Sequence, residues 1–242
     1  MFSAKILLMK KPVLITLLIS LPIASGVGTY FVTHVIERKI ADSEKQSLAE
    51  QAFQFHYYGR VNLFKEENKH LGNVDVSFIG DSLTEGYDVE TFYPDYKVVN
   101  RGISGDTTFG VEKRLDCSAY DVKPKVISML IGANNFETMM QNYEKIVQGF
   151  RENLPQTKVI LCSLTSMTGD WAKNNEIARQ NNVEIQKIAT KYGYVYADLY
   201  NALLDPNTNE LKKEYSVDGG HLTSDGYKVV TSVITPILQT LI

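Results

Sequence analysis

A serine in the first third of the chain has the surroundings that a nucleophile needs. Ser82 lies three residues after an apolar stretch, residues 74–79, and this pattern indicates a buried strand that ends in a tight turn opening a helix. At such a turn the hydroxyl is exposed, and the serine's own N–H can face a developing oxyanion. A plain helix cap by Asp81 or Ser82 is the alternative interpretation.

A histidine near the C-terminus could activate this serine. Three of the four histidines precede the predicted strand, and His221 alone follows it. Asp218 lies three residues before His221, close enough in a compact turn to hold the imidazole tautomer. An isolated Asp-x-x-His spacing is a weak signal. Combined with a serine at a strand-to-helix turn, it predicts a Ser-His-Asp triad.

Two further polar motifs also follow predicted strands. Residues 100–108 (NRGISGDTT) contain glycines that would let a backbone N–H approach a ligand closely. Residues 132–135 (GANN) contain Asn134, whose side-chain amide can point into a cleft, although Asn is also common in ordinary turns. Because the carboxyl ends of parallel strands share one edge of a sheet, we expect all these motifs to meet there.

The elements that must position these motifs alternate between strand and helix patterns. This alternation predicts β-α-β crossovers and an α/β fold with a mainly parallel five-stranded sheet covered by helices on both faces. The loop at 163–170 is expected to line the substrate cleft, with Trp171 at its edge, and a second loop is expected at 205–212. The predicted strands are 74–79, 97–100, 126–131, 158–164 and 194–199, and the predicted helices are 108–115, 136–154, 174–192 and 224–241.

With the four motifs in this order, residues 74–242 resemble the SGNH hydrolases, also called GDSL-type esterases and lipases. The resemblance implies a flavodoxin-like three-layer α/β/α sandwich. It also implies a Ser82, His221 and Asp218 triad. The implied oxyanion hole consists of the Ser82 N–H, the Gly105 N–H and the Asn134 side-chain amide.

The motif at 100–108 further resembles the acetylhydrolase branch related to platelet-activating-factor acetylhydrolases. One departure from the family pattern is Asn135, where many members carry Asp; it is not a catalytic group. The immediate neighbours of the motif residues are expected to contribute to substrate binding, namely Asp81, Leu83, Asp106 and Asn135.

The expected activity is hydrolysis of short-chain esters, above all acetyl esters and possibly on cell-surface glycans, without a metal or organic cofactor. No long apolar lid is evident, which favours short acyl chains. A lysophospholipase or thioesterase would fit the motifs equally well. An alternative from another class is a non-catalytic module that holds an anion or glycan at helix N-termini, but that function would not need His221 or Asp218.

The N-terminus carries a separate signal. Three lysines, at positions 5, 10 and 11, precede residues 12–32, which contain no charge and are long enough to cross a bilayer. The lysines predict a cytoplasmic N-terminus with the rest of the chain outside. A signal peptide cleaved after Gly26, and hence a secreted protein, is the alternative. The predicted organisation is a tip and anchor at 1–32, a stalk helix at 33–54 and the hydrolase domain at 55–242.

Composition narrows the remaining classes. The formal net charge is −3 and no basic stripe is present, so nucleic acid is not an expected partner. Cys117 and Cys162 could pair outside the cytoplasm, yet Cys162 falls within a predicted central strand. We therefore expect two unpaired thiols without a metal role. The sequence leaves the oligomeric state open.

Overall fold

The computed structural model describes the backbone of residues 26–242 and the side chains from Arg38 onward. The chain divides into two compact units, with the boundary between Ala52 and Phe53. Most of the predicted anchor, residues 12–32, lies outside the described residues. Within the described part of the chain, no helix combines the length and the apolar character needed to cross a membrane.

The helix α2 (Gly26–Leu71) is much longer than the predicted stalk helix. The prediction ended it near residue 54, where aromatic residues begin, whereas the helix continues to Leu71. Its last turns are stabilised by tertiary contacts, because Val61 and Phe64 pack with Ile103 and Cys117 in a buried cluster. The aromatic residues were expected to pack this end onto the domain; Tyr57 and Phe64 do so, while Phe55 and Tyr58 are exposed.

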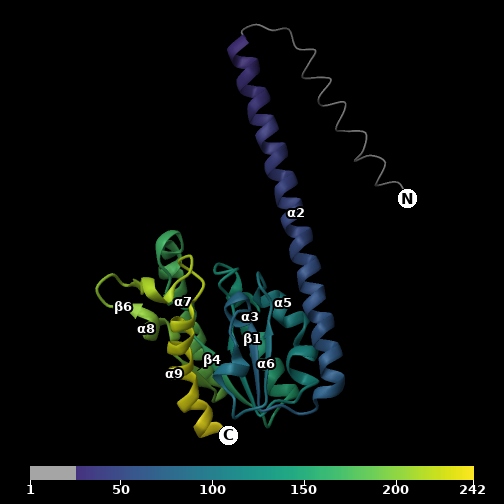
Figure 1. The fold of residues 1–242 in the computed structure, drawn as a ribbon, viewed down its shortest axis with the longest axis vertical. Helices are drawn as coiled ribbons and strands as arrows, with labels where there is room; N and C mark the ends of the chain where they lie inside the picture. Colours follow the sequence, from purple (N-terminus) through teal and green to yellow (C-terminus); the bar gives the residue numbers. More distant parts are fainter. Residues whose placement is uncertain (1–25) are drawn as a thin grey trace. The chain divides into compact units, whose positions relative to one another are not determined.

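The central sheet confirms the predicted five parallel strands (Figure 1). The spatial order is β2-β1-β3-β4-β5, which is the flavodoxin-like order. Gly80 at the end of β1 is in register with Gly102 of β2 and Leu130 of β3, so three strands end at one level. The strands are β1 (Val76–Gly80), β2 (Val98–Gly102), β3 (Val126–Leu130), β4 (Lys158–Cys162) and β5 (Val195–Ala197).

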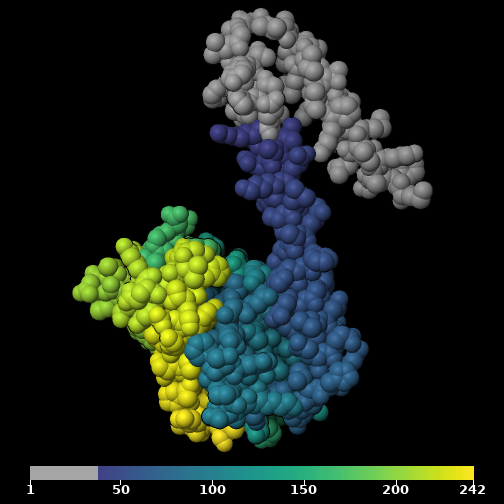
Figure 2. All heavy atoms as spheres, viewed as in Figure 1, coloured from purple at the N-terminus to yellow at the C-terminus, as the bar shows by residue number. Residues whose placement is uncertain are grey.

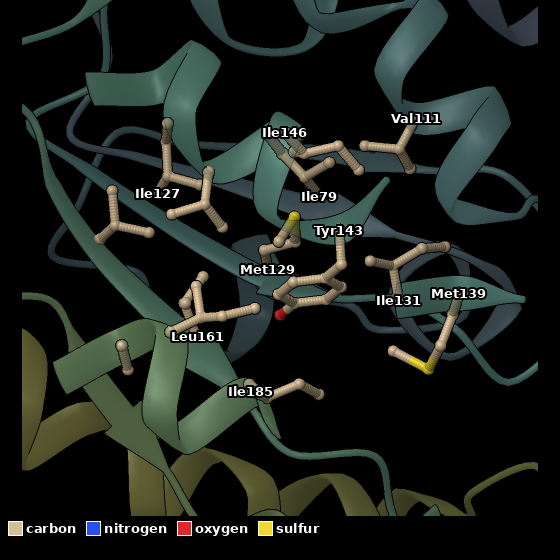
Figure 3. Close-up of a cluster of buried hydrophobic side chains, with 14 of the residues drawn as sticks. Ile79, Val111, Ile127, Met129, Ile131, Met139, Tyr143, Ile146, Leu161 and Ile185 are labelled. Carbon is tan, nitrogen blue, oxygen red and sulfur yellow. The ribbon is translucent and has the colours of Figure 1, made fainter. Parts of the chain in front are cut away.

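Helices cover both faces of this sheet, as predicted. On one face, α5 (Thr108–Lys113), α6 (Tyr143–Asn153) and α7 (Asn175–Tyr192) bury a core that includes Ile127 and Met129. Figure 3 shows the Tyr143 ring within this core. The alternate strand residues Val126 and Leu130 face a second core beneath α8 (Leu199–Leu203) and α9 (Ser224–Leu241). The period of two along β3 therefore produces the three-layer sandwich.

Several local elements differ from the sequence prediction. The predicted helix at 136–154 begins only at Tyr143, because residues before it form turns and a 3₁₀ segment, Met139–Gln141, tied to α5 by the Asn142 side chain. The expected loop at 205–212 contains a small hairpin, β6 (Leu204–Asp205) and β7 (Glu210–Leu211), whose turn is closed by the Asp205 carboxylate. The two cysteines are buried and unpaired, as predicted.

Candidate active site

The turn after β1 presents Ser82 at the start of a short helix. Asp81 caps this helix, α3 (Ser82–Glu85), because its Oδ1 accepts the Leu83 N–H at 3.1 Å. Ser82 is the first helical residue, where backbone N–H groups have no intrahelical acceptor. The capping interpretation and the exposed-serine interpretation therefore both hold: Asp81 is the cap, and Ser82 is the partly exposed residue beside it.

The structure brings Ser82, His221 and Asp218 together in one hydrogen-bonded chain. Ser82 Oγ lies 2.9 Å from His221 Nε2, and His221 Nδ1 lies 2.7 Å from Asp218 Oδ2. The other oxygen of Asp218 accepts the backbone N–H of His221 at 2.8 Å and that of Gly220 at 3.0 Å. These bonds, the His221 N–H foremost, lower the pKa of the Asp218 carboxyl to about 2. Asp218 is therefore ionised at neutral pH and can orient the imidazole.

Contacts beneath the loop at 218–221 hold the histidine side of the site. The backbone of Gly219 has a φ of 98°, and its carbonyl accepts the Thr168 N–H at 2.9 Å. A Cβ at Gly219 would lie 2.3 Å from Thr168 O, so only glycine allows this approach. The Trp171 ring packs against Gly220. Trp171 thus supports the loop that carries His221.

Residues 163–168 do not form the open cleft wall that the sequence predicted. All six are buried. Two asparagines of α7 bind their backbone from inside the protein, Asn182 at Leu164 and Asn175 at Met167. The prediction was wrong because the sequence gives no sign that buried amides would replace water as partners of this segment.

Helix α9 fixes the histidine loop relative to the serine turn. It begins three residues after His221, and Figure 2 shows this C-terminal segment, in yellow, lying against the teal surface of the chain around residues 80–110. Tyr227 of α9 donates its hydroxyl to Leu83 O at 3.1 Å and stacks on Tyr87 with ring centroids 4.9 Å apart. The docking of α9 therefore couples the positions of His221 and Ser82.

The other predicted oxyanion donors lie on the loops that follow the two neighbours of β1. After β2, the Asp106 N–H donates to Ile103 O at 3.0 Å and Gly105 has a φ of 80°, as in a type II turn with glycine at its third position. After β3, Asn134 Nδ2 donates to Asp106 O at 2.9 Å. This amide carries a second N–H that remains for a ligand. Three neighbouring strands thus deliver Ser82, Gly105 and Asn134 to the carboxyl edge of the sheet.

A buried arginine that the sequence analysis did not single out joins the serine turn to the Gly105 turn. Arg114 donates to Asp106 Oδ2 at 2.8 Å, to Gly80 O at 2.9 Å and to Arg101 O at 2.8 Å. Both members of the Arg114–Asp106 ion pair are almost completely buried. An arginine on a predicted surface helix carries no signal of this role, because its partners come from two other segments.

The four predicted substrate-binding neighbours lie mostly below the surface. Asp81, Leu83 and Asp106 are buried, and Asn135 is half-buried, donating to Thr108 Oγ1 at 3.0 Å. Their internal partners place them under the loops that carry the exposed site residues. A direct contact between any of them and substrate stays a prediction.

Asp81 should give the protein a measurable pH-dependence of stability. Burial raises the pKa of its carboxyl from 3.8 to about 6, against the opposing hydrogen bond from Leu83. Because the folded pKa is the higher one, the associated stability is present below pH 4 and is lost as the pH rises through 6, by about 3 kcal/mol. We expect Asp81→Asn to remove this component.

The measurement is urea unfolding of both proteins from pH 4 to pH 8. The stability of Asp81→Asn minus that of the native chain should increase over this range, which cancels the titration of all other groups. A difference that does not change with pH would contradict the assignment.

Metal ligation has no evident place in the described part of the chain. Among those residues, no group of three or more His, Cys, Asp or Glu side chains is arranged to hold a metal ion. The chemistry to be explained is therefore that of the hydroxyl, imidazole, carboxylate and amide groups just described.

Comparison with known proteins places the same residues in a family context. The model of the GDSL-like lipase/acylhydrolase family matches residues 78–229, a stretch that contains the whole candidate site. The human platelet-activating factor acetylhydrolase IB subunit alpha2 is 29% identical over 188 residues, covering 69% of this chain and 77% of that protein.

Solved structures show the same fold. A Streptococcus pneumonia protein named for platelet activating factor matches with a TM-score of 0.75 and 25% identity, covering 81% of this chain and 99% of that one. An acetylxylan esterase from Geobacillus stearothermophilus matches with a TM-score of 0.57 over 69% of this chain and 95% of its own. At 17% identity, the latter likeness is one of fold alone.

Proposed function

The chain belongs to the GDSL-like lipase/acylhydrolase family, and on this premise we propose that it hydrolyses short-chain esters, above all acetyl esters, with Ser82 as nucleophile. Family membership makes it an ester hydrolase and removes the need for a non-catalytic binding module. The observation that carries the assignment of roles is the unbroken hydrogen-bonded chain from Asp218 through His221 to Ser82.

The proposed reaction is a two-step acyl transfer. His221 Nε2 takes the proton of Ser82 Oγ as that oxygen attacks the ester carbonyl, and the carbonyl electron pair moves onto the oxyanion. The N–H groups of Ser82 and Gly105 and the Asn134 amide donate to this oxyanion, each contributing about 3 kcal/mol. His221 then gives its proton to the departing alkoxide, which leaves as the alcohol.

Water completes the cycle by the reverse roles. His221 removes a proton from the water as its oxygen attacks the acyl-enzyme carbonyl, and then returns the proton to Ser82 Oγ as the acid departs. Asp218 stays ionised throughout and stabilises the imidazolium, which its low pKa permits.

Two observations support a short acyl group. The matched human relative is named an acetylhydrolase. The side chains of His221 and Asp218 are 44% and 46% exposed, and Ser104 and Gly105 are exposed, so the site is open and not enclosed by a deep apolar tunnel. An open site gives a long acyl chain little apolar surface to bury.

The decisive test uses the full-length protein with p-nitrophenyl esters from acetate to long acyl chains. The rate should be highest for acetate and fall with chain length. A fluorophosphonate should modify Ser82, as identified by mass spectrometry of the labelled peptide. A preference for long chains would favour the lysophospholipase or thioesterase alternative, and neither hydrolysis nor labelling would overturn the proposal.

We further propose that residues 12–32 anchor the protein in a membrane with the hydrolase unit outside, where acetylated cell-surface glycans are available. The support is the uncharged run and its flanking lysines. The protein should then stay in the membrane pellet after alkaline carbonate extraction. A mature chain that begins after Gly26 and is found in the medium would instead show secretion.

A further inference from the structure

The short helix that begins with Ser82 ends with a carboxylate that binds the neighbouring turn. Glu85 Oε2 accepts the backbone N–H of Ser104 at 2.5 Å. Ser104 immediately precedes Gly105, so the peptide unit between them carries the proposed oxyanion donor. The acceptor on Glu85 is thus one residue from the group that would bind the reacting oxygen.

Two side chains of α2 hold Glu85 in this position. His56 Nε2 lies 3.0 Å from Glu85 Oε2, and Arg60 Nε lies 3.3 Å from Glu85 Oε1. Arg60 also donates to Gly102 O at 3.1 Å, which ties the same helix to the end of β2. Burial alone would raise the pKa of the Glu85 carboxyl, but the bonds from Ser104 and His56 outweigh it and the pKa lies below its usual value. Glu85 is therefore an ionised acceptor at neutral pH.

A third residue of α2 packs on the other side of the turn. A Cβ built on Gly105 would lie 3.1 Å from Phe53 Cδ2, so the aromatic ring covers the Cα of Gly105. The Gly105 backbone also has the left-handed φ of 80° that other residues adopt at a cost. The peptide unit before Gly105 is thus fixed at one end by Glu85 and at the other by Phe53.

We propose that Glu85 is a positioning residue for the oxyanion hole, and that residues 53–60 of α2 belong to the catalytic apparatus through it. This inference rests on the proposed function. Without the Glu85 carboxylate, the Ser104–Gly105 peptide is free to rotate and its N–H is no longer aimed at the oxyanion. Because an oxyanion develops only on the way to the tetrahedral intermediate, kcat should fall while KM changes little.

The first test compares three variants of the full-length protein with p-nitrophenyl acetate. Losing one oxyanion donor costs about 100- to 1,000-fold in kcat, so displacing one should cost about 10- to 100-fold in Glu85→Ala. Glu85→Gln keeps an oxygen that can accept the Ser104 N–H and should recover most of the rate. Glu67→Ala breaks another ion pair between α2 and the sheet, to Arg101, and should leave kcat unchanged.

A second readout separates positioning from a merely structural effect. A trifluoromethyl ketone adds to the serine and places an oxyanion in the hole, so its inhibition constant should rise in Glu85→Ala by the same factor as kcat falls. Active sites are counted by fluorophosphonate titration, so that unfolded protein does not enter either value. If Glu85→Ala does not fold, Phe53→Ala should show the same pattern at about 10-fold.

The outcomes distinguish this inference from the function beneath it. Unchanged kcat and unchanged ketone inhibition in Glu85→Ala, with Ser82 still labelled, would overturn the positioning role and leave the esterase assignment standing. A native protein that neither hydrolyses esters nor is labelled at Ser82 would overturn both.

Discussion

His221→Ala should lower kcat for p-nitrophenyl acetate by about 10⁵- to 10⁶-fold, close to the loss from Ser82→Ala, because serine and base act as one unit. His221 Nε2 lies 2.9 Å from Ser82 Oγ, and among the described side chains no other imidazole hydrogen-bonds to that oxygen. Without it the hydroxyl keeps its proton and is a weak nucleophile. The combined Ser82→Ala, His221→Ala variant should be no slower than either single variant.

Two further variants make this experiment specific. Asp218→Asn keeps the shape of the side chain but removes the charge that holds the His221 tautomer, and should cost about 10⁴-fold. His70→Ala replaces an exposed histidine near the end of α2 and should leave the rate unchanged. Equal activity of His221→Ala and His70→Ala would remove the imidazole from the mechanism.

The residues of the triad were predictable because their signals are local. Ser82 stands at the junction of an apolar run and a helix start, and Asp218 and His221 are three residues apart. The bounds of α9, which follows them, also matched the prediction, since Ser224–Leu241 has a continuous helical pattern that packing does not override. The parallel sheet followed from the alternation of strands and helices.

The residues that hold the site in place were not predictable, because their partners are distant in the sequence. Glu85 reads as an ordinary helix residue until Ser104 and His56 are brought beside it by the fold. The extent of α2 was missed for the same reason: its last turns are defined by the sheet edge they pack on. Periodicity reports which face of an element is buried, but not what that face will meet.

Arg114→Met should destabilise the protein by about 3–5 kcal/mol at pH 7, the usual cost of breaking a buried ion pair from one side. Arg114 and Asp106 have side chains 1% exposed, so the lost partner is not replaced by water. Met fills a similar volume but leaves the Asp106 carboxylate and Gly80 O without their donors. Arg179→Met, which removes an exposed ion pair with Glu176, should change stability by less than about 1 kcal/mol.

The pH-dependence of Arg114→Met identifies the buried charge as the cause. Burial already raises the pKa of the Asp106 carboxyl, and the Arg114 charge opposes that rise. Removing Arg114 raises the folded pKa further above the unfolded one, so the variant should regain stability relative to the native chain as the pH falls from 7 toward 4. Adding Asp106→Asn should restore part of the loss at pH 7, as expected for two residues that interact directly. Urea unfolding of the four proteins measures this coupling. A loss that neither low pH nor Asp106→Asn reduces would mean that Arg114 acts through packing and its backbone partners, and not through its charge.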